Sequence, residues 1–173
     1  MKQIFYAAAL ATLCGLSVRA DETVTLDKNP SIGDWTKNYV GKLGAGIIIG
    51  EPTGASLKYW LNHTVAIDGA TGWSYNVDKN IGVFYLQGDV LLHNFDLIPV
   101  SQGRLPVYLG IGGLARFRNG NQGNQCGVRM PVGLSYMFNK VPIDVFVEAA
   151  PGIDFPPYVG GDITGGIGIR FWF

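Results

Sequence analysis

The chain has 173 residues, 47% of them hydrophobic and 15% charged, which suits one folded domain rather than a disordered chain. Its 13 basic and 13 acidic residues balance, so no basic excess would attract nucleic acid. The 25 glycines argue against a helical bundle, because each glycine inside a helix costs about 0.5–1 kcal/mol relative to alanine.

Residues 1–20 have the features of an export signal. Lys2 precedes an apolar run over residues 4–16, and Val18 and Ala20 are small residues placed three and one before an expected cut. The run is shorter than the roughly 20 apolar residues of a membrane helix. We therefore expect a cleavable signal peptide, which leaves a mature chain with two more acidic than basic residues.

The two cysteines give little chemistry. Lipid attachment at Cys14 would make the chain a lipoprotein, but the preceding Leu13 is larger than the small residue expected there. After cleavage only Cys126 remains, so no intramolecular disulfide can form. We expect Cys126 to have no specific role, with a disulfide to another chain as the alternative.

Residues 21–42 are polar and predict a periplasmic lead-in, and the pattern then changes. From residue 43 onward, apolar residues alternate with small or polar ones, as the two faces of a strand do. Eight such segments follow in chain order: residues 43–50, 56–61, 65–75, 84–93, 105–118, 128–138, 144–150 and 163–173. Gly, Pro, Asn and Asp separate them in short turns, which favours antiparallel neighbours.

The last segment shows the pattern most clearly. Positions 163, 165, 167, 169, 171 and 173 are all apolar or glycine, whereas Arg170 lies on the opposite face. Its 11 residues are what a tilted strand needs to cross a bilayer. Residues 43–173 therefore predict an all-β fold, an eight-stranded antiparallel up-and-down transmembrane β-barrel (a meander) with a closed lumen.

The two faces of the strands differ in charge, and this indicates which face is inside. One set of faces carries charges: Lys58, Asp68, Asp89, Arg116, Arg129, Glu148 and Arg170. The other set is apolar and ends in aromatic rings, as lipid-facing surfaces do. We expect the charged residues to pair in a network that fills the lumen, because a lone charge there would be costly. A soluble barrel with the opposite orientation is the alternative.

An even number of strands places both termini of the chain on the periplasmic side. The turns at residues 51–54, 77–80, 119–125 and 154–162 would then face the outside of the cell. These outer turns are short, which argues against a strong adhesin, and a filled lumen argues against a porin.

The pattern resembles the OmpA-type small outer-membrane barrels, and still more a family of exported bacterial barrel proteins with no assigned activity. The likeness covers roughly residues 40–173 and is carried by residues 50–54, 58–61, 95–100, 103–106 and 165–173. In outer-membrane barrels generally, the barrel-assembly machinery recognises a final strand of alternating apolar residues that ends in Phe. The resemblance implies that role for Ile167, Ile169, Phe171 and Phe173.

The sequence shows no catalytic, metal or cofactor site. His63 falls at a turn and His93 near a strand end, and nothing brings either of them to Ser74 or Ser135 together with an acid. The glycine-rich stretches lie inside strands with no helix after them, so nucleotide binding is not expected.

We expect a monomer whose partners are outer-membrane lipids and the barrel-assembly machinery, with a structural, envelope-integrity or surface-interaction role. The alternatives are a lipid-modifying outer-membrane enzyme and a soluble periplasmic barrel that binds an apolar ligand.

Overall fold

A computed structural model describes residues 38–76, 81–118, 123–156 and 159–173 of the chain. The expected signal peptide, residues 1–20, and the lead-in up to residue 37 lie outside these ranges. Within the described ranges, no helix is both long and apolar enough to cross a membrane.

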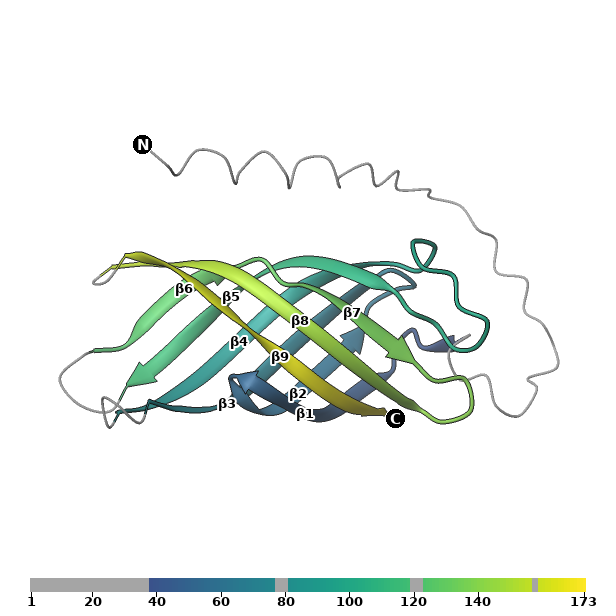
Figure 1. Cartoon of the computed structure of the whole chain (residues 1–173), viewed down its shortest axis with the longest axis horizontal. Coiled ribbons are helices and arrows are strands. Elements are labelled where there is room, and N and C mark those ends of the chain that lie inside the picture. The colour runs from purple at the N-terminus through teal and green to yellow at the C-terminus, as the bar shows by residue number, and fades with distance from the viewer. Residues whose placement is uncertain (1–37, 77–80, 119–122, 157–158) are drawn as a thin grey trace. The chain divides into compact units, whose positions relative to one another are not determined.

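The described strands form one antiparallel sheet. They are β1 (Leu43–Glu51), β2 (Thr53–Trp60), β3 (Val65–Asn76), β4 (Ile81–Asn94), β5 (Val107–Arg118), β6 (Gln125–Arg129), β7 (Val132–Met137), β8 (Ile143–Asp154) and β9 (Gly160–Trp172). Strands β1 to β5 pair in chain order, β6 and β7 both lie between β5 and β8, and β8 pairs with β9. Because β9 also pairs with β1, the sheet closes into a ring (Figure 1).

The segment expected to be one strand over residues 128–138 is instead divided into β6 and β7. Both halves pair with β5 in a single uninterrupted register. Pro131 lies between them and has no N–H to donate, although its carbonyl still accepts a hydrogen bond from the Gly110 N–H at 2.8 Å. The two halves occupy one position of the ring. The ring therefore has eight positions in meander order, and the predicted fold class is confirmed.

The expected boundaries were wrong at the β8–β9 turn. Residues 154–162 were expected to form a loop, but β8 runs to Asp154 and β9 begins at Gly160, with these two residues paired. The hairpin is therefore longer than the alternation pattern predicted. This shift brings Asp154 and Asp162 into the barrel wall.

The strands cross the barrel obliquely because the register is staggered around the ring. The pairing can be followed from strand to strand through Gly44, Lys58, Asp68, Asp89, Gly112, Arg129, Gly152 and Asp162. Gly44, however, pairs directly with Trp172 of β9, ten residues beyond Asp162 on that strand. Such a stagger tilts the strands by about 35–45° and leaves an interior that side chains can fill.

The inner and outer faces are as the charge pattern predicted. The residues on the charged faces are buried, among them Lys58, Arg129 and Arg170, each only 1% exposed. The apolar faces point outward, and Ile49 and Ile111 are 66% and 65% exposed. Glycines allow some of the close approaches inside: a Cβ on Gly46 would lie 1.8 Å from the Ile169 carbonyl oxygen. The barrel is inverted relative to a water-soluble one.

Candidate functional site: the charged lumen

Nine lysine, arginine, aspartate and glutamate side chains are buried in the described part of the barrel. They are Lys58, Asp68, Asp89, Arg116, Arg129, Asp144, Glu148, Asp154 and Arg170. They come from β2, β3, β4, β5, β6, β8 and β9, so nearly every wall of the barrel contributes. Inside a narrow lumen such charges need partners, because removing a charge from water without compensation costs several kcal/mol.

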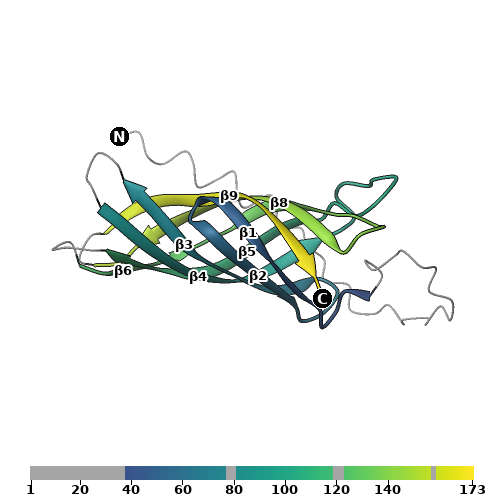
Figure 2. The ribbon, with the colours of Figure 1, turned by 90° about the horizontal axis from the view of Figure 1, so that it is seen from below.

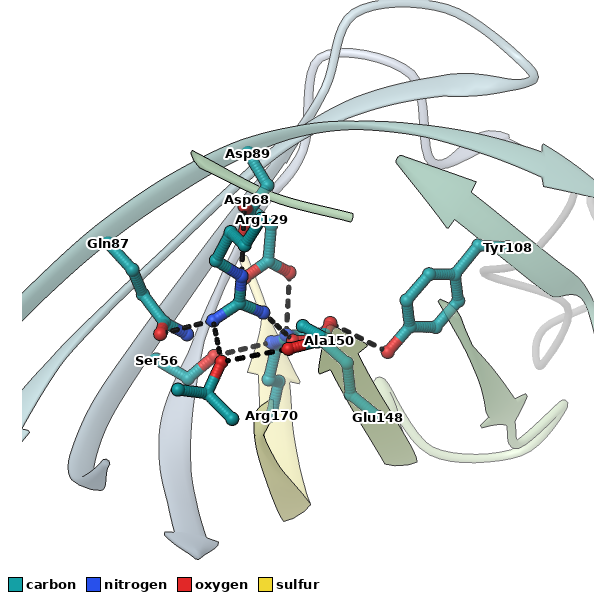
Figure 3. Close-up of polar contacts among 10 residues, drawn as sticks. Ser56, Asp68, Gln87, Asp89, Tyr108, Arg129, Glu148, Ala150 and Arg170 are labelled. Atoms are coloured by element: carbon teal, nitrogen blue, oxygen red, sulfur yellow. Dashed lines mark hydrogen bonds and ion pairs between the residues drawn. The ribbon is translucent and has the colours of Figure 1, made fainter. Parts of the chain in front are cut away.

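Arg129 is the centre of the first group of contacts (Figure 3). Its Nε lies 3.2 Å from Oδ1 of Asp89, and its Nη2 forms an ion pair with Glu148. Its Nη1 donates to the side-chain oxygen of Gln87 and, at 3.3 Å, to the hydroxyl oxygen of Thr164. The guanidinium therefore connects β6 to β4, β8 and β9. Its positive charge lies beside two carboxylates that would otherwise be buried without a cation.

Arg170 is the centre of a second group. Its Nη2 donates to Oδ2 of Asp68 at 2.6 Å, and its Nε donates to the Ser56 hydroxyl oxygen at 2.9 Å. Its Nη1 lies 3.8 Å from Oδ2 of Asp144, and its Cζ lies 3.7 Å from the centre of the Phe146 ring. Asp68 and Asp89 are cross-strand neighbours on β3 and β4. Each of these two like charges thus contacts a different arginine.

Lys58 has no carboxylate oxygen within 4.0 Å among the described residues, and its nearest polar contact is a histidine. Its Nζ lies 2.7 Å from Nε2 of His93, while Nδ1 of His93 lies 3.3 Å from the Thr64 carbonyl oxygen. A carbonyl can only accept, so Nδ1 is the protonated nitrogen and Nε2 accepts from Lys58. The ammonium also lies 4.8 Å from the ring centre of Tyr108, whose hydroxyl donates to Glu148 at 3.1 Å.

Arg116 lies apart, near the end of the barrel that holds the β1–β2 and β8–β9 turns, which we call the far end. Its Nη1 contacts both carboxylate oxygens of Asp154, at 2.6 and 2.7 Å, and its Nη2 forms an ion pair with Asp162. The guanidinium carbon lies 5.3 Å from the ring centre of Tyr85, and the Tyr85 hydroxyl donates to Glu51 at 2.5 Å. The far end therefore combines three carboxylates with this arginine.

The seven charges singled out from the sequence all lie in the lumen, but they do not form one network. Ion pairs join Arg129 to Asp89 and Glu148, and Arg170 to Asp68. The other acidic partners were missed: Asp144, which pairs with Arg170, and Asp154 and Asp162, which pair with Arg116. Asp144 was detectable, because it stands on the same face of its strand as Glu148. The other two were assigned to a loop.

The opposite end, where β1 begins and β9 ends, is closed by aromatic rings, and we call it the near end. Tyr39, from the described part of the lead-in, is only 2% exposed and lies 4.5 Å from Trp60 and 5.6 Å from Phe95 between ring centres. Its hydroxyl donates to the His63 carbonyl oxygen at 2.6 Å. The Arg104 guanidinium lies over the rings of Tyr39 and Phe95. The alternation pattern could not indicate this aromatic plug, because Tyr39 precedes the first strand.

The residues expected to guide assembly lie on the outer face of β9 and, for Phe173, directly after its end. Ile167, Ile169, Phe171 and Phe173 are all exposed, and the rings of the last two meet edge to face, 5.1 Å apart between centres. This placement leaves the four side chains accessible. Their role in assembly stays a prediction.

The barrel is similar to a solved structure, the crystal structure of the N-terminal β-barrel domain of Pseudomonas aeruginosa OprF. The match has a TM-score of 0.59 and 17% sequence identity, and it covers 78% of this chain and 98% of that one. The fold is that of an OmpA-type barrel. No protein-family model matches the chain, and no curated protein matches it. At this identity the likeness shows the fold alone.

Proposed function

We propose that this chain is an integral β-barrel of the bacterial outer membrane, exported by a cleaved signal peptide, with a structural, envelope-integrity or surface-interaction role and no catalytic activity. The observation that carries the proposal is the inversion of the barrel, with buried charges inside and a continuous apolar surface outside. Water-soluble monomers rarely expose apolar patches larger than a few hundred Å². In a bilayer this apolar surface would contact lipid instead of water, so its exposure would carry no such cost in free energy.

Aromatic rings on the outer surface support a membrane position. Near the far end, Trp73, Phe84 and Phe117 stand on the neighbouring strands β3, β4 and β5. The ring centre of Phe84 lies 5.2 Å from that of Trp73 and 6.1 Å from that of Phe117. Near the other end lie Tyr136, Phe138, Phe171 and Phe173. Two aromatic belts that flank an apolar band are typical of outer-membrane barrels, in which the rings lie at the two interfaces.

The filled lumen favours a structural role over transport. Arg129 and Arg170, with their carboxylates, occupy the middle of the barrel, and the aromatic group around Tyr39 closes the near end. Lipids would be the main partners of the outer surface, and the barrel-assembly machinery would recognise the final strand. We expect a monomer with the near end toward the periplasm and the far end outside the cell.

The two alternative functions make different demands on the same residues. A lipid-modifying enzyme would need a His beside a Ser or an acid near the lipid boundary. Instead, His93 contacts Lys58 and Thr64, while the Ser135 hydroxyl donates to Asp144 at 3.1 Å. A soluble barrel would hold its apolar ligand in a lumen that charged side chains here fill. Neither alternative is favoured by a specific contact.

Cell fractionation tests the proposal directly. We expect the protein in the outer-membrane fraction, released only by detergent, and a gel mobility that changes on heating, as a closed barrel gives. A chain without residues 1–20 should fail to reach that fraction. Recovery of the full chain in the soluble periplasm without detergent would overturn the membrane assignment.

A further inference from the structure

The rim at the far end is uneven, because the β1–β2 hairpin turns early. Strand β1 ends at Glu51, opposite Gly165, whereas β9 continues to Gly160 along β8. Residues 160–164 therefore have no strand on the side where β1 would lie, within the described part of the chain. Figures 1 and 2 show β3, β8 and β9 reaching beyond the β1–β2 turn.

The ladder on the other side of the hairpin shows which backbone groups face this free edge. The Met130 N–H donates to the Pro151 carbonyl at 2.9 Å, and the Phe155 N–H donates to the Cys126 carbonyl at 2.8 Å. Odd-numbered residues at this end of β8 therefore direct their backbone groups at β6, not at β9. Backbone groups alternate in direction along an antiparallel ladder. Their cross-strand partners on β9, Gly161 and Ile163, thus direct N–H and C=O groups toward the free edge.

The side chains beside this edge have two different characters. On the outer side, Val159 and Ile163 are 70% and 71% exposed, and Gly161 leaves open space between them. On the inner side, Asp162 is half-exposed beside Asp154, with both carboxylates sharing Arg116. An added strand would thus meet apolar groups with one face and an excess of carboxylate with the other.

We propose that the free edge of β9 at residues 160–164 binds an extended segment of a partner protein, in which basic and apolar residues alternate, as an added β-strand. Backbone hydrogen bonds to Gly161 and Ile163 would supply affinity, and alternate side chains would supply specificity, as in other cases of strand addition. Proteins usually protect an exposed edge with Pro, Lys or a covering loop. Residues 160–164 contain neither Pro nor Lys. The inference rests on the proposed function only for placing this rim at the cell surface.

The test uses the full chain, isotopically labelled and folded in detergent micelles, with an eight-residue peptide of alternating lysine and valine as the probe. We expect titratable shifts and slowed hydrogen exchange at the amides of Gly161 and Ile163. A peptide of alternating glutamate and valine should bind at least about tenfold more weakly, because it presents carboxylates to Asp162 and Glu51.

Two variants at adjacent positions separate edge binding from general attraction. Gly161→Pro removes an edge N–H without removing a ladder hydrogen bond to β8, and it should weaken binding of the lysine–valine peptide about tenfold or more. Gly160→Ala should bind as the wild type does, because its Cβ meets nothing within 4 Å and its N–H faces β8. Ile163→Pro repeats the test at the second edge position.

Equal binding of the lysine–valine peptide by the wild type and both proline variants, each heat-modifiable, would overturn the inference. The protein could instead bind no peptide and self-associate, as detected by sedimentation. If Gly161→Pro abolishes that self-association, the occupant of the edge is a second copy of this chain, and the proposed partner protein is wrong. If the barrel is found in the outer membrane but its Gly161 and Ile163 amides show no shift and no slowed exchange with the peptide, this inference alone is refuted. A soluble periplasmic protein would instead refute the proposed function.

Discussion

Arg170 and Asp68 form an ion pair across the lumen, with 2.6 Å between Nη2 and Oδ2, although β1 and β2 separate their strands in the ring. Both side chains are almost fully buried, at 1% and 5% exposure. The pair between Arg129 and Asp89 has the same character, because β5 separates their strands. Such contacts connect walls that the hydrogen-bond ladder does not connect. Removing one partner leaves a buried charge with less compensation from its neighbours, in a place that water hardly reaches.

The cost of such a removal can be measured at Glu148. Glu148→Ala takes one carboxylate from Arg129 and the acceptor from the Tyr108 hydroxyl. We expect it to lower the free energy of unfolding by about 3–5 kcal/mol, as loss of one partner of a buried pair does. Urea unfolding in phospholipid vesicles, followed by tryptophan fluorescence, measures the change. Glu148→Gln keeps the volume and an acceptor and should cost less; a trivial loss in both variants would contradict the lumen network.

The loss of stability caused by removing an arginine should depend on the position of that arginine along the barrel. Arg129→Met leaves Asp89 and Glu148, at 1% and 4% side-chain exposure, without their cation. Arg116→Met leaves Asp154 and Asp162, at 12% and 33%, which water reaches more easily. We therefore expect Arg129→Met to lower the free energy of unfolding by several kcal/mol and Arg116→Met by about half as much. Equal losses in the same urea titration would show that the greater exposure of the carboxylates at the far end does not reduce the cost of removing their arginine.

Strand alternation was enough to predict the eight-position ring. A period of two assigns each residue to one face. The charges on one set of faces, and the aromatic rings at the ends of the other set, then indicated which faces point inward. The same rule should have added Asp144 to the lumen charges, because it is two positions from Phe146 and four from Glu148 on one strand. The seven lumen charges predicted from the sequence therefore lack a residue that the alternation places among them.

Other features could not be predicted from the pattern. Asp154 and Asp162 lie beside Pro156 and Gly160, whose residue types indicate a turn, so alternation could not show that pairing with β8 continues to Gly160. The contact between Lys58 and His93 depends on which residues meet across the lumen, and this is set by the stagger of the ring. A single strand carries no information about that stagger.

Glycine at position 46 is expected to be required by the closeness of the neighbouring strand. A Cβ there would lie 1.8 Å from the Ile169 carbonyl oxygen and 2.7 Å from the Arg170 Cα, both of which are backbone atoms. Gly46→Ala should therefore lower the free energy of unfolding by about 1–3 kcal/mol. Gly88→Ala is the matched control, because a Cβ at Gly88 meets nothing within 4 Å. A loss of stability of the same size in both variants would contradict the steric reason.

A charge on the outer surface tests the lipid contact. Ile169 stands on the outer face of β9, between Ile167 and Phe171, and is 44% exposed. Ile169→Arg should destabilise the vesicle-embedded protein by about 2–4 kcal/mol if the position is near the bilayer midplane. The same substitution at Val159, beyond the apolar band, should cost little, because the charge stays in water. A soluble barrel would tolerate both substitutions equally in an unfolding titration.

The near-end plug should respond to alkaline pH through Tyr39. Burial raises the pKa of the Tyr39 phenol from 10.0 to about 12. Because the pKa is higher in the folded state, the folded chain holds the proton more tightly, so the stabilisation is complete below pH 10 and is lost between pH 10 and 12. The loss amounts to about 2–3 kcal/mol.

Tyr39→Phe isolates this effect from the titration of other groups. At neutral pH the variant lacks the hydrogen bond to the His63 carbonyl and should be less stable than the wild type by about 1 kcal/mol. Phe cannot ionise, so the difference should shrink above pH 10 and reverse before pH 12. Unfolding curves of both proteins at pH 8, 10 and 11.5 measure the crossing. Parallel pH profiles for the two proteins would mean that Tyr39 is in contact with water, and that the near end is open rather than closed by this ring.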